Sequence, residues 1–344
     1  MLYRRPFVLF ALIITSQACG GSPSAPTSEA PAASIALSFD GVTISAIDGQ
    51  PIQSVTVKVG SQTAVSDTNG AFRVQNVTGG SQLAILTGAS VVERHTVVTT
   101  PSVEPARESL IPAAFDLVAF DQMFRGGNGG LQRWTTAPSL VVLTTVMTYA
   151  NGLSAGDEYY ATSEQLTDAE TTELIDHLTE ALALLTGNTF TRFASVERES
   201  ASSGAKVNTL RTGKIVVGRY RNIRALVNTI GFGRWGTDDS GQVTGGAVYL
   251  DRDFDKTNEA RRLLRTHELG HALGYAHVTA RPSIMNPSIG AEPTAFDRQG
   301  AVIAFQRMPG NQSPDTDPAT SKVSGGELII APRIVSPVWS PPIN

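Results

Sequence analysis

The chain has 344 residues, enough for two folded domains, and 41% of them are hydrophobic while 17% are charged, a balance typical of folded soluble proteins. The formal net charge is −4, and no basic run interleaves with the few aromatic residues. Composition therefore excludes a nucleic-acid-binding surface as the expected function.

Residues 1–18 have the pattern of a secretory signal. Arg4 and Arg5 give a positive start, and an apolar core follows from Phe7 to Ile14. That core is too short to span a bilayer as a helix. The sequence therefore predicts an exported protein.

The single cysteine, Cys19, follows Ala18 directly after the signal. A small residue before a lone cysteine at this place resembles a bacterial lipoprotein processing site, although that family usually has leucine where this chain has Ser16. The resemblance implies a lipidated Cys19 and a membrane anchor, and the alternative is ordinary cleavage after Ala18. With no second cysteine, no disulfide framework can form. Residues 19–34 are rich in proline, serine and alanine, which predicts an extended tether.

Residues 35–112 show short apolar alternations separated by turn signals, which predict a small antiparallel β-sandwich. The run from Gly49 to Val57 and the turn from Ser66 to Phe72 resemble the carboxypeptidase regulatory-like domain. The resemblance implies a module without catalytic residues, which binds, spaces or supports its neighbour.

Residues 113–137 are predicted to connect this module to a second domain. A short helix is expected at 115–120 and a flexible break at the glycine-rich stretch 126–130, while Phe124 and Trp134 are expected to pack.

The second domain is predicted to span residues 138–310. The apolar run 140–147 predicts a buried strand, and Thr167 to Glu170 resembles a capping box that starts a helix. Further strands are expected at 214–218 and 246–250, and the glycines of 231–241 predict a loop.

Three of the five histidines lie in the stretch from His267 to His277. On a helix, His267 and His271 share one face because they are four residues apart. Gly274 can take the left-handed conformation that ends a helix and turns the chain back. That reversal would bring His277 to the same point as a third ligand.

Three imidazoles with an open fourth position predict a catalytic zinc site. Zn²⁺ lowers the pKa of a water in such a position from roughly 15.7 towards ~7. Glu268, one step round the helix from His267, can take the proton of that water and later pass it to a leaving amine.

The pattern His-Glu-x-x-His-x-x-Gly-x-x-His resembles the signature of metzincin zinc endopeptidases. The stretch from Ser283 to Pro287 resembles the methionine turn of the matrix metalloproteinases, and its methionine, Met285, follows His277 by eight residues. The resemblance implies zinc ligands at His267, His271 and His277, a general base at Glu268, and a turn methionine at Met285. It also implies a mixed sheet whose strand at 246–250 is the antiparallel edge that pairs with substrate.

Around this motif, Thr257 and Asn258 are predicted to cap the zinc helix, and Arg265 is expected to face solvent. Asp251, Asp253 and Asp255 could be ligands of a structural Ca²⁺, but they lack the spacing of a calcium loop, and a solvated strand end is expected instead. Thr294 to Asp297 is predicted to cap a last helix, and residues 311–344 are predicted to be a proline-rich tail.

The predicted fold class is therefore an all-β sandwich followed by an α/β (α+β) zinc protease domain of metzincin type. The predicted function is a zinc-dependent endopeptidase that acts on extended proteins or peptides and meets a membrane only through the lipid on Cys19. Two alternatives stay open: a cell-surface binding lipoprotein with a non-catalytic zinc site, and a zinc exopeptidase. The intact Glu268 speaks against the first, since a structural site would not need it.

Overall fold

The computed structural model of the chain describes residues 37–126, 129–150, 158–289 and 291–318. The predicted signal, Cys19 and the predicted tether lie outside the described residues. The described part belongs to one unit of the chain, residues 36–344. Within it, no helix is both long and apolar enough to cross a membrane.

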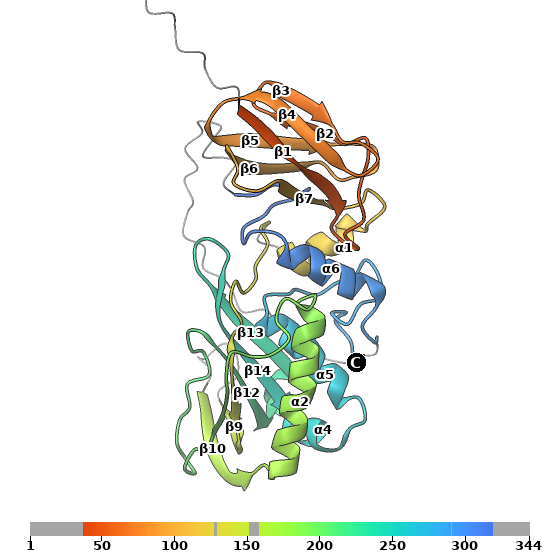
Figure 1. The fold of residues 1–344 in the computed structure, drawn as a ribbon. Helices are drawn as coiled ribbons and strands as arrows, with labels where there is room; N and C mark the ends of the chain where they lie inside the picture. Colours follow the sequence, from red (N-terminus) through yellow and green to blue (C-terminus); the bar gives the residue numbers. More distant parts are fainter. Residues whose placement is uncertain (1–36, 127–128, 151–157, 290, 319–344) are drawn as a thin grey trace, which may run out of the picture. The chain divides into compact units, whose positions relative to one another are not determined.

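The first part of this unit is a β-sandwich of two sheets, with strand orders β4-β1-β7 and β3-β2-β5-β6 (Figure 1). Phe39 and Val74 from one sheet and Val57 and Leu86 from the other are buried in a shared core. The predicted sandwich is confirmed, except that β1 and β7 pair in parallel. The strands are β1 (Leu37–Ser45), β2 (Thr56–Val59), β3 (Gln62–Val65), β4 (Ala71–Val77), β5 (Gly80–Thr87), β6 (Arg94–Thr100) and β7 (Ala106–Leu110).

The second part is a mixed sheet in which β12 and β14 pair in parallel, while β13 pairs antiparallel with β14. Helix α5 packs on β13 and β14, and α2 packs on α5 (Figure 1). The strands are β8 (Ser139–Leu143), β9 (Thr145–Ala150), β10 (Glu158–Gln165), β11 (Val196–Glu199), β12 (Lys214–Arg221), β13 (Gly231–Thr237) and β14 (Val243–Asp251). The helices are α1 (Leu117–Phe120), η1 (Asp121–Arg125), α2 (Asp168–Leu185), α3 (Ile223–Val227), α4 (Arg252–Thr257), α5 (Arg261–Ala272) and α6 (Ala295–Phe305).

Several predictions for this part are confirmed by the local structure. Thr167 and Glu170 form the predicted capping box at the start of α2, and Thr294 and Asp297 form another at α6. The predicted strand at 140–147 is wrong in one respect, because the chain breaks at Thr144 into β8 and β9.

The predicted strands at 214–218 and 246–250 are confirmed as parts of β12 and β14, but the predicted loop at 231–241 and the predicted edge position of 246–250 are wrong. The glycine-rich stretch forms strand β13, which ends the strand path, and β14 lies inside the sheet between β12 and β13. Glycines occur in β13 because α5 lies very close to it: a Cβ on Gly233 would be 2.5 Å from the Cβ of His271. The edge strand beside the zinc helix is therefore β13.

The predicted connector, 113–137, is part of the core that includes α5. Phe120, Phe124 and Trp134 are buried in the same cluster as Leu269. The indole nitrogen of Trp134 donates to the carbonyl of Ala272 at the end of α5. This segment supports the helix directly.

The predicted tail begins too early at residue 311. Asn311, Asp315 and Asp317 are buried, and their side chains accept hydrogen bonds from three arginines, of which Arg125 binds Asn311. Arg94 on β6 donates to Asp315 and Asp317, and Arg307 after α6 donates to Asp315. The ordered chain therefore continues past α6 and joins it to the β-sandwich.

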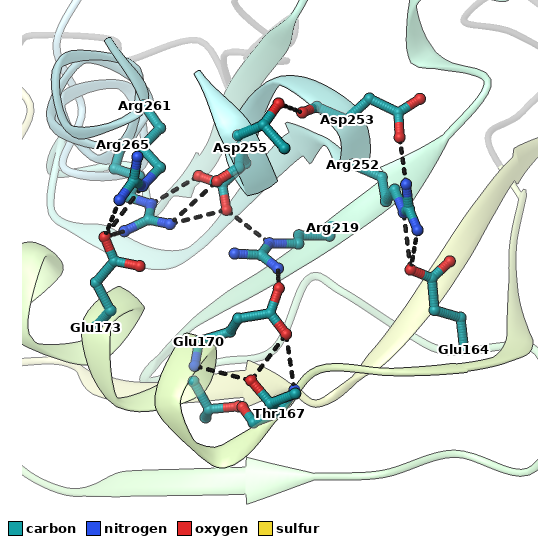
Figure 2. Close-up of polar contacts among 12 residues, drawn as sticks. Glu164, Thr167, Glu170, Glu173, Arg219, Arg252, Asp253, Asp255, Arg261 and Arg265 are labelled. Atoms are coloured by element: carbon teal, nitrogen blue, oxygen red, sulfur yellow. Dashed lines mark hydrogen bonds and ion pairs between the residues drawn. The ribbon is translucent and has the colours of Figure 1, made fainter. Parts of the chain in front are cut away.

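A buried ion network ties α5 to α4, β12 and α2 (Figure 2). Asp255 on α4 is fully buried and accepts hydrogen bonds from Arg219 on β12 and Arg265 on α5, at 2.7 and 2.6 Å. Arg219 also donates to Glu170 on α2. Burial alone would raise the pKa of Glu170, but hydrogen bonds from the Thr167 backbone and from Arg219 lower it to about 2. Three elements, α4, β12 and α5, thus meet at the Asp255 carboxylate, and Arg219 links them to α2.

This network corrects the predictions for the acidic triplet and for Arg265. Asp251 caps α4 and Asp255 binds buried arginines, so neither belongs to a solvated strand end, whereas the side chain of Asp253 pairs with Arg252 and is 79% exposed. Arg265 is buried because it neutralises Asp255.

The predicted caps of the zinc helix are also misplaced. Thr257 ends α4, and Asn258 is the C-cap of that helix. Helix α5 begins at Arg261, with Ala260 as an N-cap that makes no side-chain hydrogen bond. Its position therefore depends on packing and on Arg265.

We expect Asp255→Ala to lower the free energy of unfolding by about 3–5 kcal/mol, because buried Arg265 would lose its buried carboxylate partner and Arg219 would lose one of its two. Urea denaturation measures this loss. The control is Glu180→Ala, which removes the exposed Arg262–Glu180 pair and should cost only ~0–1 kcal/mol. Equal costs for the two variants would contradict an anchoring role of Asp255.

Candidate metal centre

Three histidines from α5 and the turn after it converge on one point. The Nε2 atoms of His267, His271 and His277 lie 3.2, 3.1 and 3.3 Å from one another. Nitrogens at about 2.0–2.1 Å from a tetrahedral zinc ion would be about 3.3–3.4 Å apart. The spacing fits three corners of a tetrahedron, and these residues could hold a metal ion.

The other ring nitrogens fix the orientation of two imidazoles. His267 Nδ1 lies 2.7 Å from the carbonyl of Ile284, and His271 Nδ1 lies 2.7 Å from the carbonyl of Tyr275. A carbonyl can only accept, so each Nδ1 carries the proton and each Nε2 presents a lone pair to the centre. Such outer hydrogen bonds are typical of metal-ligating histidines.

The turn that returns His277 depends on Gly274, as predicted. Its φ of +105° disfavours residues with a side chain, and a Cβ there would lie 2.9 Å from the carbonyl of Gln132. Beyond it, the Ala276 amide donates to the carbonyl of Met123 in the π-helix η1. The connector thus holds the loop that carries the third histidine.

Met285, the predicted turn methionine, packs against α5 at Gly270. It is fully buried, and a Cβ on Gly270 would overlap its sulfur and lie 3.0 Å from its terminal methyl carbon. Gly270 stands between the two helical histidines, so the methionine packs against the part of α5 that presents them.

The turn around Met285 is held by Asp297, whose role the sequence did not reveal. The buried Asp297 carboxylate accepts hydrogen bonds from the Ser283 hydroxyl and from the backbone amide of Ile284. The backbone carbonyl of Ile284 in turn accepts a hydrogen bond from His267 Nδ1. Asp297 is visible in the sequence only as a helix cap. Nothing in the neighbouring sequence indicates that this capping carboxylate also binds the turn at Ser283 and Ile284.

Glu268 lies against the edge strand. It is 1% exposed, and a Cβ on Gly231 would be 3.1 Å from its Oε1. Further along β13, the indole of Trp235 is parallel to the ring of His271, with centroids 6.4 Å apart, and donates to the side chain of Gln132. The sequence does not predict Trp235 or Gln132 at this site, because Trp235 lies in a stretch predicted to be a loop and Gln132 lies in the predicted connector.

Burial favours the neutral form of all three histidines. It lowers the pKa of His267 to about 4, with some opposition from the hydrogen bond to Ile284. Burial, followed by the nearby His267, lowers the pKa of His277 to about 4. For His271, burial and both neighbouring histidines place the pKa well below its usual range. Neutral imidazoles are the form that binds metals.

No family model matches the chain, and no curated protein matches it. Among solved structures, the chain is similar to the GM1-bound form of the ECX AB5 holotoxin, with 13% sequence identity, coverage of 57% of this chain and 93% of that chain, and a TM-score of 0.28. This low score carries no argument about fold or function.

We expect Gly270→Ala to weaken Zn²⁺ binding at least tenfold, because the added methyl group would displace Met285 or the histidines beside it. Competition with a chromophoric chelator measures the affinity. Gly236→Ala is the control, since a Cβ there meets nothing within 4 Å. An unchanged affinity in the Gly270 variant would show that the methionine contact does not set the site.

We expect the metal-free protein to lose stability as the pH falls from about 6.5 to about 4. The unfolded chain takes up protons on these histidines near pH 6.5, whereas folded His267 and His277 resist protonation down to about pH 4. The urea midpoint of chelator-treated protein should therefore be lower at pH 5 than at pH 7, and His277→Gln should make this difference smaller. A midpoint that rises at pH 5 would contradict these pKa values.

Proposed function

We propose that this chain is a zinc-dependent endopeptidase of metzincin type. The observation that carries the proposal is the convergence of the three Nε2 atoms at tetrahedral spacing, with Glu268 as the neighbouring carboxylate. The hydrogen bonds of His267 and His271 to backbone carbonyls, together with the packing of Met285 against Gly270, support this proposal of a catalytic metal site.

In this proposal His267, His271 and His277 hold Zn²⁺. When bound, the ion supplies Lewis acidity, which lowers the pKa of a water from roughly 15.7 towards ~7. Glu268 accepts a proton from the attacking water as the new carbon–oxygen bond forms. It then donates that proton to the amine as the carbon–nitrogen bond breaks, so water is divided between a carboxylate and an amine product.

Strand β13 is proposed to bind the substrate backbone. Its pairing with β14 occupies one side of the strand, and no strand among the described residues pairs with its other edge, which we propose for strand addition. Antiparallel pairing is slightly more stable per residue than parallel pairing, and we propose that orientation for the substrate. The strand passes Glu268 at Gly231 and His271 at Gly233, so it can support residues on both sides of the scissile bond. This supports an endopeptidase over an exopeptidase.

The remaining proposals come from the sequence. Export and a lipid anchor at Cys19 would place the enzyme on the outer side of a membrane, where protein or peptide substrates would be extended or unfolded.

We expect Glu268→Ala to retain about one Zn²⁺ per chain and to lose cleavage of an unfolded protein by roughly 10²–10⁴-fold, the usual contribution of general acid–base catalysis. Elemental analysis and a cleavage assay with and without chelator give the two readings. His271→Ala is the control that should lose the metal as well.

Peptides blocked at both ends test the endopeptidase reading, because an exopeptidase would leave them intact. Unchanged cleavage by the Glu268 variant with zinc bound would contradict its role as base. A zinc-loaded parent chain that cleaves nothing would instead support the non-catalytic binding protein.

A further inference from the structure

Arg265, which ties α5 to Asp255, has a further partner on α2. Its Nη1 atom lies 2.7 Å from Nδ1 of His177. Because a guanidinium can only donate hydrogen bonds, Nδ1 of His177 is the acceptor, and the neutral imidazole carries its proton on Nε2. His177 therefore holds Arg265 only in its neutral form.

Solvent reaches His177 but not Arg265. The side chain of His177 is 21% exposed and lines a cavity of about 740 Å³ between α2, α5 and α6. Arg265 is fully buried, and a guanidinium keeps its charge in proteins. A change of pH can thus alter one partner of this hydrogen bond while the other stays charged.

The charges that face His177 are of both signs. On α2, Oε1 of Glu173 lies 4.0 Å from Nε2 of His177, and Glu180 also lines the cavity. These two carboxylates pair with Arg261 and Arg262 of α5. The other charged groups of the cavity are Glu259, Glu292 and Arg298, and Asp255 of α4 is the carboxylate bound to Arg265.

These surroundings favour the neutral form of His177. Burial, followed by the charge of Arg265, lowers the pKa of His177, and the carboxylates of Glu173 and Glu180 oppose this effect. Protonation of folded His177 therefore requires a pH below about 6.5, the usual pKa of a histidine.

Protonation would reverse the contact with Arg265. A proton on Nδ1 removes the acceptor and places a second positive charge next to a buried guanidinium, where a like charge is costly. The side chains of His177 and Arg265 would have to move apart. Arg265 precedes His267 by two residues in α5, so its movement acts on the helix that presents His267 and His271.

We propose that His177 is a positioning residue of the metal centre, and that its protonation in acid weakens the binding of Zn²⁺ by the three histidines. Neutral His177 and Asp255 together hold Arg265, whereas protonated His177 repels Arg265 and leaves Asp255 as the partner that fixes α5. The inference rests on the proposed zinc site and does not depend on peptide cleavage. It makes zinc retention sensitive to pH at a residue outside the metal-binding group.

The test compares the Zn²⁺ affinity of the parent chain, His177→Asn and His177→Leu by competition with a chromophoric chelator. Oδ1 of asparagine can replace Nδ1 as an acceptor that does not titrate, whereas leucine has no acceptor. At pH 7 we expect His177→Asn to keep the parental Kd. His177→Leu should bind roughly three- to tenfold more weakly, which is less than the loss of a direct partner of a ligand costs.

In acid the parent chain and His177→Asn should differ. The Kd of every chain rises from pH 7 to pH 5, because the zinc ligands themselves take up protons. The rise should be roughly three- to tenfold larger in the parent, which also loses the contact between His177 and Arg265. An equal rise in the parent and His177→Asn would overturn the inference, and so would a parental Kd for folded His177→Leu at pH 7.

His95→Asn is the matched control. His95 lies on β6 of the β-sandwich, is 32% exposed and pairs with Glu93 rather than with an arginine of α5. The same substitution there should leave the parental pH dependence of the Kd unchanged. A smaller rise in this variant as well would overturn the inference, because the effect would then come from the loss of any titrating histidine.

The NMR signals of His177 separate this inference from the proposed function. Coupling between two sites is reciprocal, so Zn²⁺ should lower the pKa of His177 by about 0.5 if protonation weakens zinc binding threefold. A proton on Nδ1 of His177 at pH 7, or the same pKa with and without Zn²⁺, would overturn the inference. A chain that binds no Zn²⁺ would overturn the zinc site as well, whereas a zinc-loaded chain that cleaves nothing would overturn the proposed function alone.

Discussion

The close approach of helix α5 to the sheet is the constraint on which the metal centre depends. Gly233 and Gly246 let β13 and β14 touch this helix, because a Cβ on either would lie within 2.7 Å of its atoms. On another side, Gly270 leaves room for Met285. The helix is therefore enclosed by backbone and sulfur at contact distance, which leaves its histidines little freedom to move.

Polar contacts add direction to this packing. Arg265 ties the middle of the helix to the buried Asp255, while Asp297 holds the turn whose Ile284 carbonyl orients His267. Both carboxylates are fully buried, where an unpaired charge would be costly. The hydrogen bonds of Asp255 fix the position of α5, and those of Asp297 fix the turn that contains Ile284. Both carboxylates therefore favour the arrangement of the histidines that the glycine contacts allow. Support of this kind holds the three histidines of the candidate metal site in one arrangement.

The sequence predicted those parts of the site that have local signals. The spacing of the three histidines, the left-handed Gly274 and the capping boxes of α2 and α6 each depend on residues within a few positions of one another. Long-range packing was misread: the glycines of β13 predicted a loop, because sequence alone does not show that a helix lies against them. Arg265 was expected in solvent for the same reason, since its partner Asp255 had been assigned to a strand end. The buried aspartates after α6 resembled a polar tail because their arginine partners are far away in the chain.

The position of the third histidine, His277, depends on contacts between residues that are far apart in the sequence. His277 follows a loop whose Ala276 amide binds the Met123 carbonyl in η1. Arg125 at the end of η1 donates to Asn311, which donates to Asp315 and Asp317, and these carboxylates hold Arg94 of the β-sandwich. The buried charges form one connected set, so separating the sandwich would leave aspartates and Arg307 without part of their pairing. The β-sandwich is for this reason joined to the framework of the metal centre, and its resemblance to a binding module does not make it a separable one.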